Sequence, residues 1–331
     1  MGARLHPSKV LYSGNERTLP ALSACEHYAG GEKQIHKALA LQTKLGPVFD
    51  ITCDCEDGAP AGSERRHAEM IAACILSDAN RHRRVGARIH DITHPYWRDD
   101  LRIIVGQAGA RLAYVVLPKV RGIDDVLTQL AVLRDLQKSR GIERAIPVHV
   151  LIETPAALRE AWQIAAIATV ESLDFGLMDY VSAHHGAIPA GAMRSPGQFE
   201  HPLIVRAKCE IAAAALGNCV VPTHNVSVEL RDGAVVREDA RRARQEFGFL
   251  RMWSIHPDQI LPIVEAMRPD FDEIAEATEI LCAAQKADWG PIQHAGKLHD
   301  RATFRYYWQL LRRAQATGMS LPEPANERFF N

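Results

Sequence analysis

The sequence lacks the signals that would place a 331-residue chain in several specialised classes. No apolar run approaches the roughly 20 residues needed to span a bilayer, so we expect no membrane partner. No basic cluster interleaved with aromatic residues occurs and the formal net charge is −1, which argues against a nucleic-acid partner. The seven cysteines are odd in number and scattered, which disfavours a disulfide framework. Because the N-terminus also lacks the apolar core of a signal peptide, we expect a cytoplasmic protein.

The apolar content of 47% is typical of a globular protein with a sizeable core, and the apolar runs recur regularly. Helical patterns separate these runs, so the chain reads as eight β-then-α units over about 270 residues. This number favours an α/β fold of the (β/α)8 TIM-barrel type, whose usual size is roughly 250 residues. A doubly wound sheet is the rival, but no Gly-x-Gly-x-x-Gly follows the first strand. The expected strands are 10–14, 48–57, 84–90, 112–117, 148–152, 173–178, 218–222 and 252–255.

Two parts of the chain fall outside this repeat. The stretch 181–202 is long and rich in Gly, Ala, Pro and His, which is typical of an active-site lid. The region after the last unit carries two further helical patterns, at 271–287 and 302–317. We therefore predict a barrel over 1–270 and a C-terminal helical extension over 271–331. Since eight strands already close a barrel, the extension is expected to pack on a neighbouring subunit of a homo-oligomer.

The stretch from Val148 to Pro155 is the most informative in the chain. It reads as a buried strand that stops on Glu153, with Thr154 as the N-cap and Pro155 in the first turn of a following helix. The next strand ends on Asp179 in the same way. Neighbouring strands lie about 4.8 Å apart, so these two carboxylates would repel each other without a cation between them. Two carboxylates with no reserved His or Cys suit Mg²⁺, which we predict as the cofactor.

Other charged residues collect at the predicted carboxyl ends of strands, where barrel enzymes place their active sites. Arg88 would lie among the acids of the second strand and be held rigid by them. A fixed guanidinium beside Mg²⁺ meets the needs of an enolate or an α-keto carboxylate. The structural alternative is an ion pair with Asp54 or Glu56. The full set of strand-end residues is Asp54, Glu56, Asp57, Arg88, Lys119, Glu153, Asp179 and His256.

Several of these positions also carry a family resemblance. The run Asp54-Cys55-Glu56-Asp57 resembles the Asp-Leu-Glu-Asp signature of citrate lyase β-subunit-like enzymes, in the HpcH/HpaI aldolase and citrate lyase family. The resemblance extends over about residues 10–300 and implies a Mg²⁺-dependent TIM barrel that makes or breaks carbon–carbon bonds of 3-hydroxyacyl thioesters such as citryl, malyl or citramalyl. It implies that Glu153 and Asp179 bind the metal and that Arg88 binds the substrate. Further matches fall at 87–89, 117–120, 151–158, 174–179 and 255–260.

The resemblance completes the set of predicted site residues. Gly296 and Asp300 are similar to a segment in which the family's Asp reaches a neighbouring subunit's active site and serves in proton transfer, which implies a trimer or a hexamer. Predicted catalytic residues are Arg88, Asp54, Glu56 and Asp300, and predicted substrate-binding residues are Arg88, Lys119, His256 and Arg17.

The sequence also departs from the family pattern around the mouth of the barrel. The family's usual Asn after Arg-Ile is His90 here, and its Gly-Lys before the last strand is Leu250-Arg251. Its Asp after the seventh strand is replaced by Thr-His-Asn at 223–225. These changes leave the metal pair intact, but they leave open whether the small-molecule substrate is carried by coenzyme A or by an acyl carrier protein.

The main functional prediction is a Mg²⁺-dependent carbon–carbon lyase of the retro-aldol or Claisen type. One alternative is hydrolysis of an acyl-CoA thioester on the same site. A second is a carrier-dependent lyase subunit that is inactive until an acyl carrier protein delivers the substrate. The acyl group itself is left open by the sequence.

Overall fold

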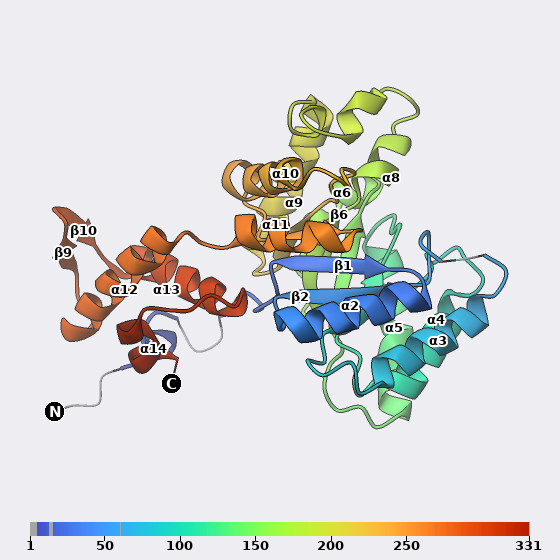
Figure 1. Cartoon of the computed structure of the whole chain (residues 1–331), viewed down its shortest axis with the longest axis horizontal. Helices are drawn as coiled ribbons and strands as arrows, with labels where there is room; N and C mark the ends of the chain where they lie inside the picture. The colour runs from blue at the N-terminus through green and yellow to red at the C-terminus, as the bar shows by residue number, and fades with distance from the viewer. Residues whose placement is uncertain (1–4, 13–15, 60, 331) are drawn as a thin grey trace. The chain divides into compact units, whose positions relative to one another are not determined.

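The computed structural model describes residues 5–12, 16–59 and 61–330 of the chain (Figure 1). These residues form two compact units. One unit is Ser23–Met267, and the other combines the described residues up to Leu22 with those from Arg268 onward. Among the helices that the structure describes, none is long and apolar enough to cross a membrane.

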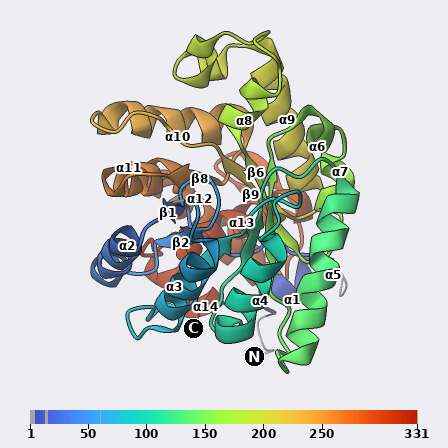
Figure 2. The ribbon, with the colours of Figure 1, turned by 90° about the vertical axis from the view of Figure 1, so that its right-hand side faces the viewer.

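The unit Ser23–Met267 is a closed barrel of eight parallel strands in sequential order, which confirms the predicted (β/α)8 fold. Figure 2 shows the helices of this unit arranged around the strands. The strands are β1 (Cys25–Ala29), β2 (Phe49–Asp54), β3 (Val85–Arg88), β4 (Val115–Leu117), β5 (Val148–Ile152), β6 (Val170–Phe175), β7 (Val221–His224) and β8 (Arg251–Ser254).

Helices of the barrel unit follow the strands at short intervals, as the sequence pattern predicts. Between β6 and α9, the predicted lid segment contains the end of α8 and two short 3-10 helices, η1 (Ala190–Met193) and η2 (Gly197–Phe199). The α-helices are α2 (Glu32–Leu45), α3 (Glu64–Leu76), α4 (Trp97–Ala108), α5 (Ile123–Ser139), α6 (Pro155–Arg159), α7 (Ala161–Ala165), α8 (Leu177–Ser182), α9 (Pro202–Gly217), α10 (Gly233–Phe247) and α11 (Pro257–Met267).

The first predicted strand is wrong. The residues up to Val10 form the short helix α1 (Pro7–Val10), and residues 13–15 lie outside the described part of the chain. The first barrel strand is β1, which the sequence reading passed over because Glu26 and His27 interrupt its apolar pattern. Glu26 is nevertheless fully buried, since an arginine on β8 pairs with it. Strand β7 is also displaced from the predicted 218–222: it begins at Val221 and extends over the polar pair Thr223-His224.

The second unit has its own hydrophobic core. Helices α12 (Phe271–Lys286), α13 (Arg301–Ala316) and α14 (Glu323–Phe329) pack together with the antiparallel hairpin of β9 (Ile292–His294) and β10 (Lys297–His299). Leu11 is 1% exposed within the same cluster as Phe304 and Trp308, so the N-terminal segment is part of this core. The packing of this region on a neighbouring subunit stays a prediction.

Candidate active site

Arg88 is the last residue of β3, and its guanidinium binds the acids at the carboxyl end of β2. Nε of Arg88 donates to Oδ1 of Asp54 at 2.7 Å, and Nη2 donates to Oδ2 at 2.5 Å. Asp54 also accepts backbone N–H groups from Glu56 at 2.9 Å and Gly58 at 2.8 Å. Burial alone would raise the pKa of Asp54, but the charge and hydrogen bonds of Arg88 outweigh it and lower the pKa. The carboxylate is therefore ionised and fixes the arginine in one orientation.

Glu56 and Lys119 continue the charged cluster. Oε2 of Glu56 lies 3.1 Å from Nη1 of Arg88, and its other oxygen contacts the ammonium of Lys119. Nζ of Lys119 also donates to Asp57 at 2.9 Å. The backbone N–H of Lys119 donates to Glu153, at a residue whose φ is +48°. Lys119 thus connects the acids after β2 with the acid after β5.

Glu153 follows β5 and is 2% exposed. The predicted helix start after it is confirmed, because Oγ1 of Thr154 accepts the backbone N–H of Ala157 at 3.0 Å and Pro155 opens α6. On the other side, Gly176 approaches so closely that an added Cβ would lie 2.3 Å from Oε2 of Glu153. The carboxylate is therefore confined between two strand ends.

The chemistry of Glu153 and Asp179 fits a divalent cation. The predicted strand over 173–178 is displaced, because β6 ends at Phe175 and a helix starts directly after it. Asp179 therefore does not end a strand but lies in the first turn of α8. Burial and the negative charge of Asp179 raise the pKa of Glu153 to about 8, against the opposing effects of the Lys119 N–H and Arg88. A buried carboxyl group whose ionised form is disfavoured by a neighbouring carboxylate offers, with that neighbour, the kind of oxygen donors that Mg²⁺ accepts together with water and substrate oxygens.

The remaining predicted residues have different environments. His256 follows β8, and its side chain is 40% exposed beside Asp258. Arg17 and Asp300 both belong to the second unit. Asp300 is the N-cap of α13, where it accepts the backbone N–H of Ala302 at 3.0 Å. This cap accounts for an acid at position 300 in structural terms, and its role in a neighbouring active site stays a prediction.

The sequence reading missed one pair next to this cluster. Nδ1 of His90 lies 2.6 Å from Oδ2 of Asp100, which is 1% exposed in the first turn of α4. Asp100 looks like an ordinary acid near a helix N-terminus, so only its burial reveals it. His90 itself was visible in the sequence as a departure from the family pattern.

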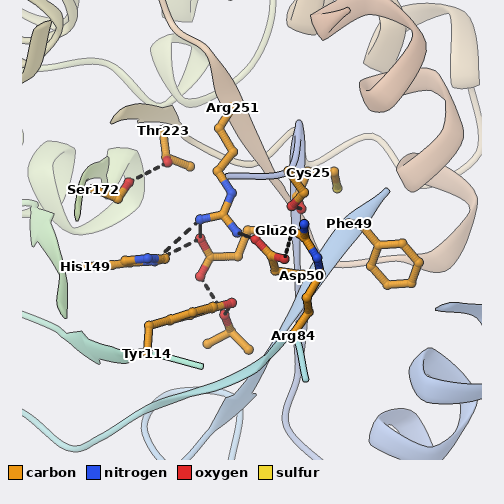
Figure 3. Close-up of polar contacts among 12 residues, drawn as sticks. Cys25, Glu26, Phe49, Asp50, Arg84, Tyr114, His149, Ser172, Thr223 and Arg251 are labelled. Carbon is orange, nitrogen blue, oxygen red and sulfur yellow. Dashed lines mark hydrogen bonds and ion pairs between the residues drawn. The ribbon is translucent and has the colours of Figure 1, made fainter. Parts of the chain in front are cut away.

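A second charged network fills the barrel interior (Figure 3). Nη1 of Arg251 lies 2.7 Å from Oε2 of Glu26, and Nη2 of Arg251 contacts Asp50, which also accepts Nη1 of Arg84 at 3.0 Å. Possible ligand atoms of Glu26, His149 and Asp174 lie within 4.8 Å of one another. Arg251 already supplies positive charge to this group, since its guanidinium lies 3.4 Å from Nδ1 of His149. The network therefore carries its own cation, unlike the pair at Glu153 and Asp179.

The fold and the site together define a class of protein: a (β/α)8-barrel enzyme with acids and an arginine at the carboxyl ends of its strands. Residues 48–257 match the HpcH/HpaI aldolase/citrate lyase family, and the chain belongs to it. This confirms the resemblance seen in the sequence and the prediction of a carbon–carbon lyase.

Individual relatives agree with the family assignment. A crystal structure of a citrate lyase from Burkholderia xenovorans LB400 superposes with a TM-score of 0.86 and 54% identity, covering 98% of this chain and 100% of the other. The L-malyl-CoA/beta-methylmalyl-CoA lyase of Cereibacter sphaeroides is 26% identical over 80% of this chain and 87% of its own. CitE from Mycobacterium tuberculosis, in complex with magnesium, acetoacetate and coenzyme A, is 21% identical with a TM-score of 0.67, over 89% of this chain and 99% of CitE, and shares the fold.

Proposed function

We propose that this enzyme is a Mg²⁺-dependent lyase that cleaves a 3-hydroxyacyl thioester, such as a citryl-, malyl- or citramalyl-CoA, or a related hydroxy or oxo acid. The observation that carries the proposal is the buried carboxylate of Glu153 beside the half-buried Asp179, with Glu153 connected through Lys119 to the cluster that fixes Arg88. A relative named as an L-malyl-CoA/beta-methylmalyl-CoA lyase supports the choice of substrate class.

Arg88 is suited to bind the fragment that becomes an enolate. A guanidinium has five N–H donors. Two of them donate to Asp54, and Nη1 lies 3.1 Å from Glu56 as an ion pair without a hydrogen bond, so the N–H groups of Nη1 are suited to a substrate oxygen. Because the two acids hold the group rigidly, no reorganisation is needed when negative charge develops on the substrate oxygen.

Glu153 and Asp179 would hold the ion, with the confinement by Gly176 setting the position of the Glu153 oxygens. When bound, Mg²⁺ would act as a Lewis acid on the carbonyl of the oxo-acid fragment. Lys119 and His256 are the further substrate-binding residues of this proposal. Burial raises the pKa of Glu56, and the ammonium of Lys119 opposes this rise through its contact with the carboxylate.

The second unit enters the proposal through the assembly. We infer that the chain is a cytoplasmic homo-oligomer, a trimer or a hexamer, in which residues 271–331 pack on a neighbouring subunit. Asp300 and Arg17 would then complete a neighbour's site. Leu298 is 74% exposed and Tyr306 57% exposed in the described unit, which supplies apolar surface for such an interface.

The test is a screen of the purified full-length protein with Mg²⁺ against 3-hydroxyacyl-CoAs and free hydroxy acids, with products identified by mass. Cleavage into an oxo acid and a shorter acyl-CoA is the expected result. Release of free coenzyme A with the acyl group intact would instead make the enzyme a thioesterase. Turnover only when the substrate is attached to an acyl carrier protein would make it a carrier-dependent lyase subunit.

The Asp179→Asn variant connects the screen to the site. It should lose turnover at every Mg²⁺ concentration tested while keeping its thermal unfolding transition. Turnover equal to that of the wild type would remove Asp179 from the metal site even if the enzyme is a lyase.

A further inference from the structure

A histidine and a buried aspartate form a fixed pair directly after β3. Oδ2 of Asp100 lies 2.6 Å from Nδ1 of His90 and accepts its backbone N–H at 2.9 Å. The ring of His94 stacks on that of His90 at 3.9 Å between centroids and 8° between planes. Since the carboxylate accepts a hydrogen bond from Nδ1–H, Nε2 is the ring atom left to accept or release a proton. Asp100 therefore sets the tautomer of His90, and His94 sets the plane of its ring.

His90 lines a cavity of about 310 Å³ that also has Glu56 and Lys119 in its wall. Glu56 is the residue whose other oxygen contacts Arg88, so the cavity adjoins the proposed active site. His90 is 8% exposed, so its ring is largely shielded from bulk water. A proton-transfer group needs this combination of access to the substrate and limited access to solvent.

The charges around His90 set the pKa of its ring. Burial lowers the pKa of His90, but the hydrogen bond and charge of Asp100, with the charges of Glu56 and Glu64, raise it above its ordinary value of 6.5. The environment therefore favours the imidazolium more than solvent does, and the ring remains a group that can exchange a proton. The other charged or titratable groups in the wall of the cavity are Asp57, Asp91, His94 and Lys119.

We propose that His90 is the acid–base residue of this lyase and that Asp100 is its positioning residue. The inference rests on the proposed function. Nε2 of the neutral ring takes the proton of the substrate's 3-hydroxyl group. The O–H electron pair then forms the new carbonyl, and the carbon–carbon bond breaks with its electrons moving onto the thioester enolate.

The same ring completes the cycle. The enolate carbon takes the proton back from Nε2, which returns the imidazole to its neutral form. One proton has moved from oxygen to carbon, and no further reactant is consumed.

The experiment compares the wild type with His90→Asn and Asp100→Asn on a substrate found in the screen. Asparagine keeps an N–H donor for the carboxylate but cannot titrate. For His90→Asn we expect kcat to fall by a factor of roughly 100 or more with little change in KM, as when a general acid–base group is lost. The limb of the kcat–pH profile due to this group should disappear. Asp100→Asn should move that limb to lower pH.

Two further measurements keep the result interpretable. Asp125→Asn is the matched control, because Asp125 also lies in the first turn of a helix, where it accepts the backbone N–H of Arg121 at 3.0 Å without a histidine. It should leave the kcat–pH profile unchanged.

Exchange of the acyl product's α-protons with D2O should also be lost in His90→Asn. A wild-type enzyme that cleaves its substrate while His90→Asn keeps the same kcat and the same profile would overturn the role of His90 alone. A wild-type enzyme that cleaves nothing would overturn the proposed function as well.

Discussion

Replacement of Arg88 by lysine tests whether the site needs a planar guanidinium or only a positive charge. In the structure, Arg88 is 9% exposed and makes one two-point contact to Asp54 and a third contact to Glu56 at 3.1 Å. A lysine ammonium is a point charge that cannot reproduce the fork to Asp54 and also present further donors in the same plane. The variant therefore keeps the charge and loses the geometry.

Two magnitudes follow from this loss. Removal of a fixed donor from the developing negative charge typically costs on the order of 3 kcal/mol, so kcat should fall by a factor of roughly 100 or more. The free energy of unfolding should fall by about 1–3 kcal/mol, because a buried carboxylate loses a hydrogen bond to a charged donor. The first effect appears in kcat at saturating substrate and Mg²⁺, and the second in denaturant unfolding, so the two can be measured separately.

Arg121→Lys is the matched control. Arg121 also makes a two-point contact to a carboxylate, that of Asp125, but its side chain is 63% exposed and lies outside the cluster around Arg88. Its replacement should leave kcat unchanged. An Arg88→Lys enzyme with near-normal kcat would show that Arg88 has a structural role only, and the reasoning about its free donors would then be refuted.

Three other perturbations probe the metal, the barrel interior and the assembly. Glu153→Gln should abolish Mg²⁺ binding measured by calorimetry while Glu171→Gln, at the opposite end of β6, leaves it intact; unchanged affinity in both would contradict the metal site. Burial alone would raise the pKa of Glu26, but its arginine partner lowers it to about 2, so its contribution to stability is present above about pH 4.5 and lost as the pH falls toward 2. The free energy of unfolding of Glu26→Gln should therefore depend less steeply on pH in that range than that of the wild type. An equal slope in the two proteins would argue against a lowered pKa of Glu26. Mixed oligomers of Asp300→Asn and Arg88→Ala subunits should regain activity if the site is shared, whereas exchanged oligomers without rescue would exclude it.

Much of the barrel could be predicted from the sequence because most of its strands are apolar. Strands β4 and β5 consist mainly of β-branched or leucine residues, and their ends are marked by Pro118-Lys119 and by Glu153. The helix start at Thr154 followed from a local rule, since a capping side chain and a proline act within one turn. Features that depend on neighbours in sequence were therefore predictable.

The features that were missed depend on partners far away in the chain. β1 was overlooked because Glu26 is 225 positions from Arg251, the residue that makes its burial tolerable. Asp100 was overlooked because only the packing of α4 shows that it is buried against His90. A buried charge is recognised by its partner, and a single sequence does not give the pairing.

The arrangement of charge along the barrel strands distinguishes the interior acidic group from the acidic group for which a cation is proposed. Because side chains alternate along a strand, His149, Leu151 and Glu153 point to the same side of β5 at successive levels. Leu151 packs in one cluster with Trp253, two residues beyond Arg251 on β8. An apolar level therefore lies between the interior network and the strand ends. The interior acids Glu26 and Asp50 pair with Arg251. The guanidinium of Arg88 is instead held by Asp54, and burial beside Asp179 raises the pKa of Glu153 to about 8 despite Arg88. This difference is what supports the proposal of a divalent ion at Glu153 and Asp179 and of none in the interior network.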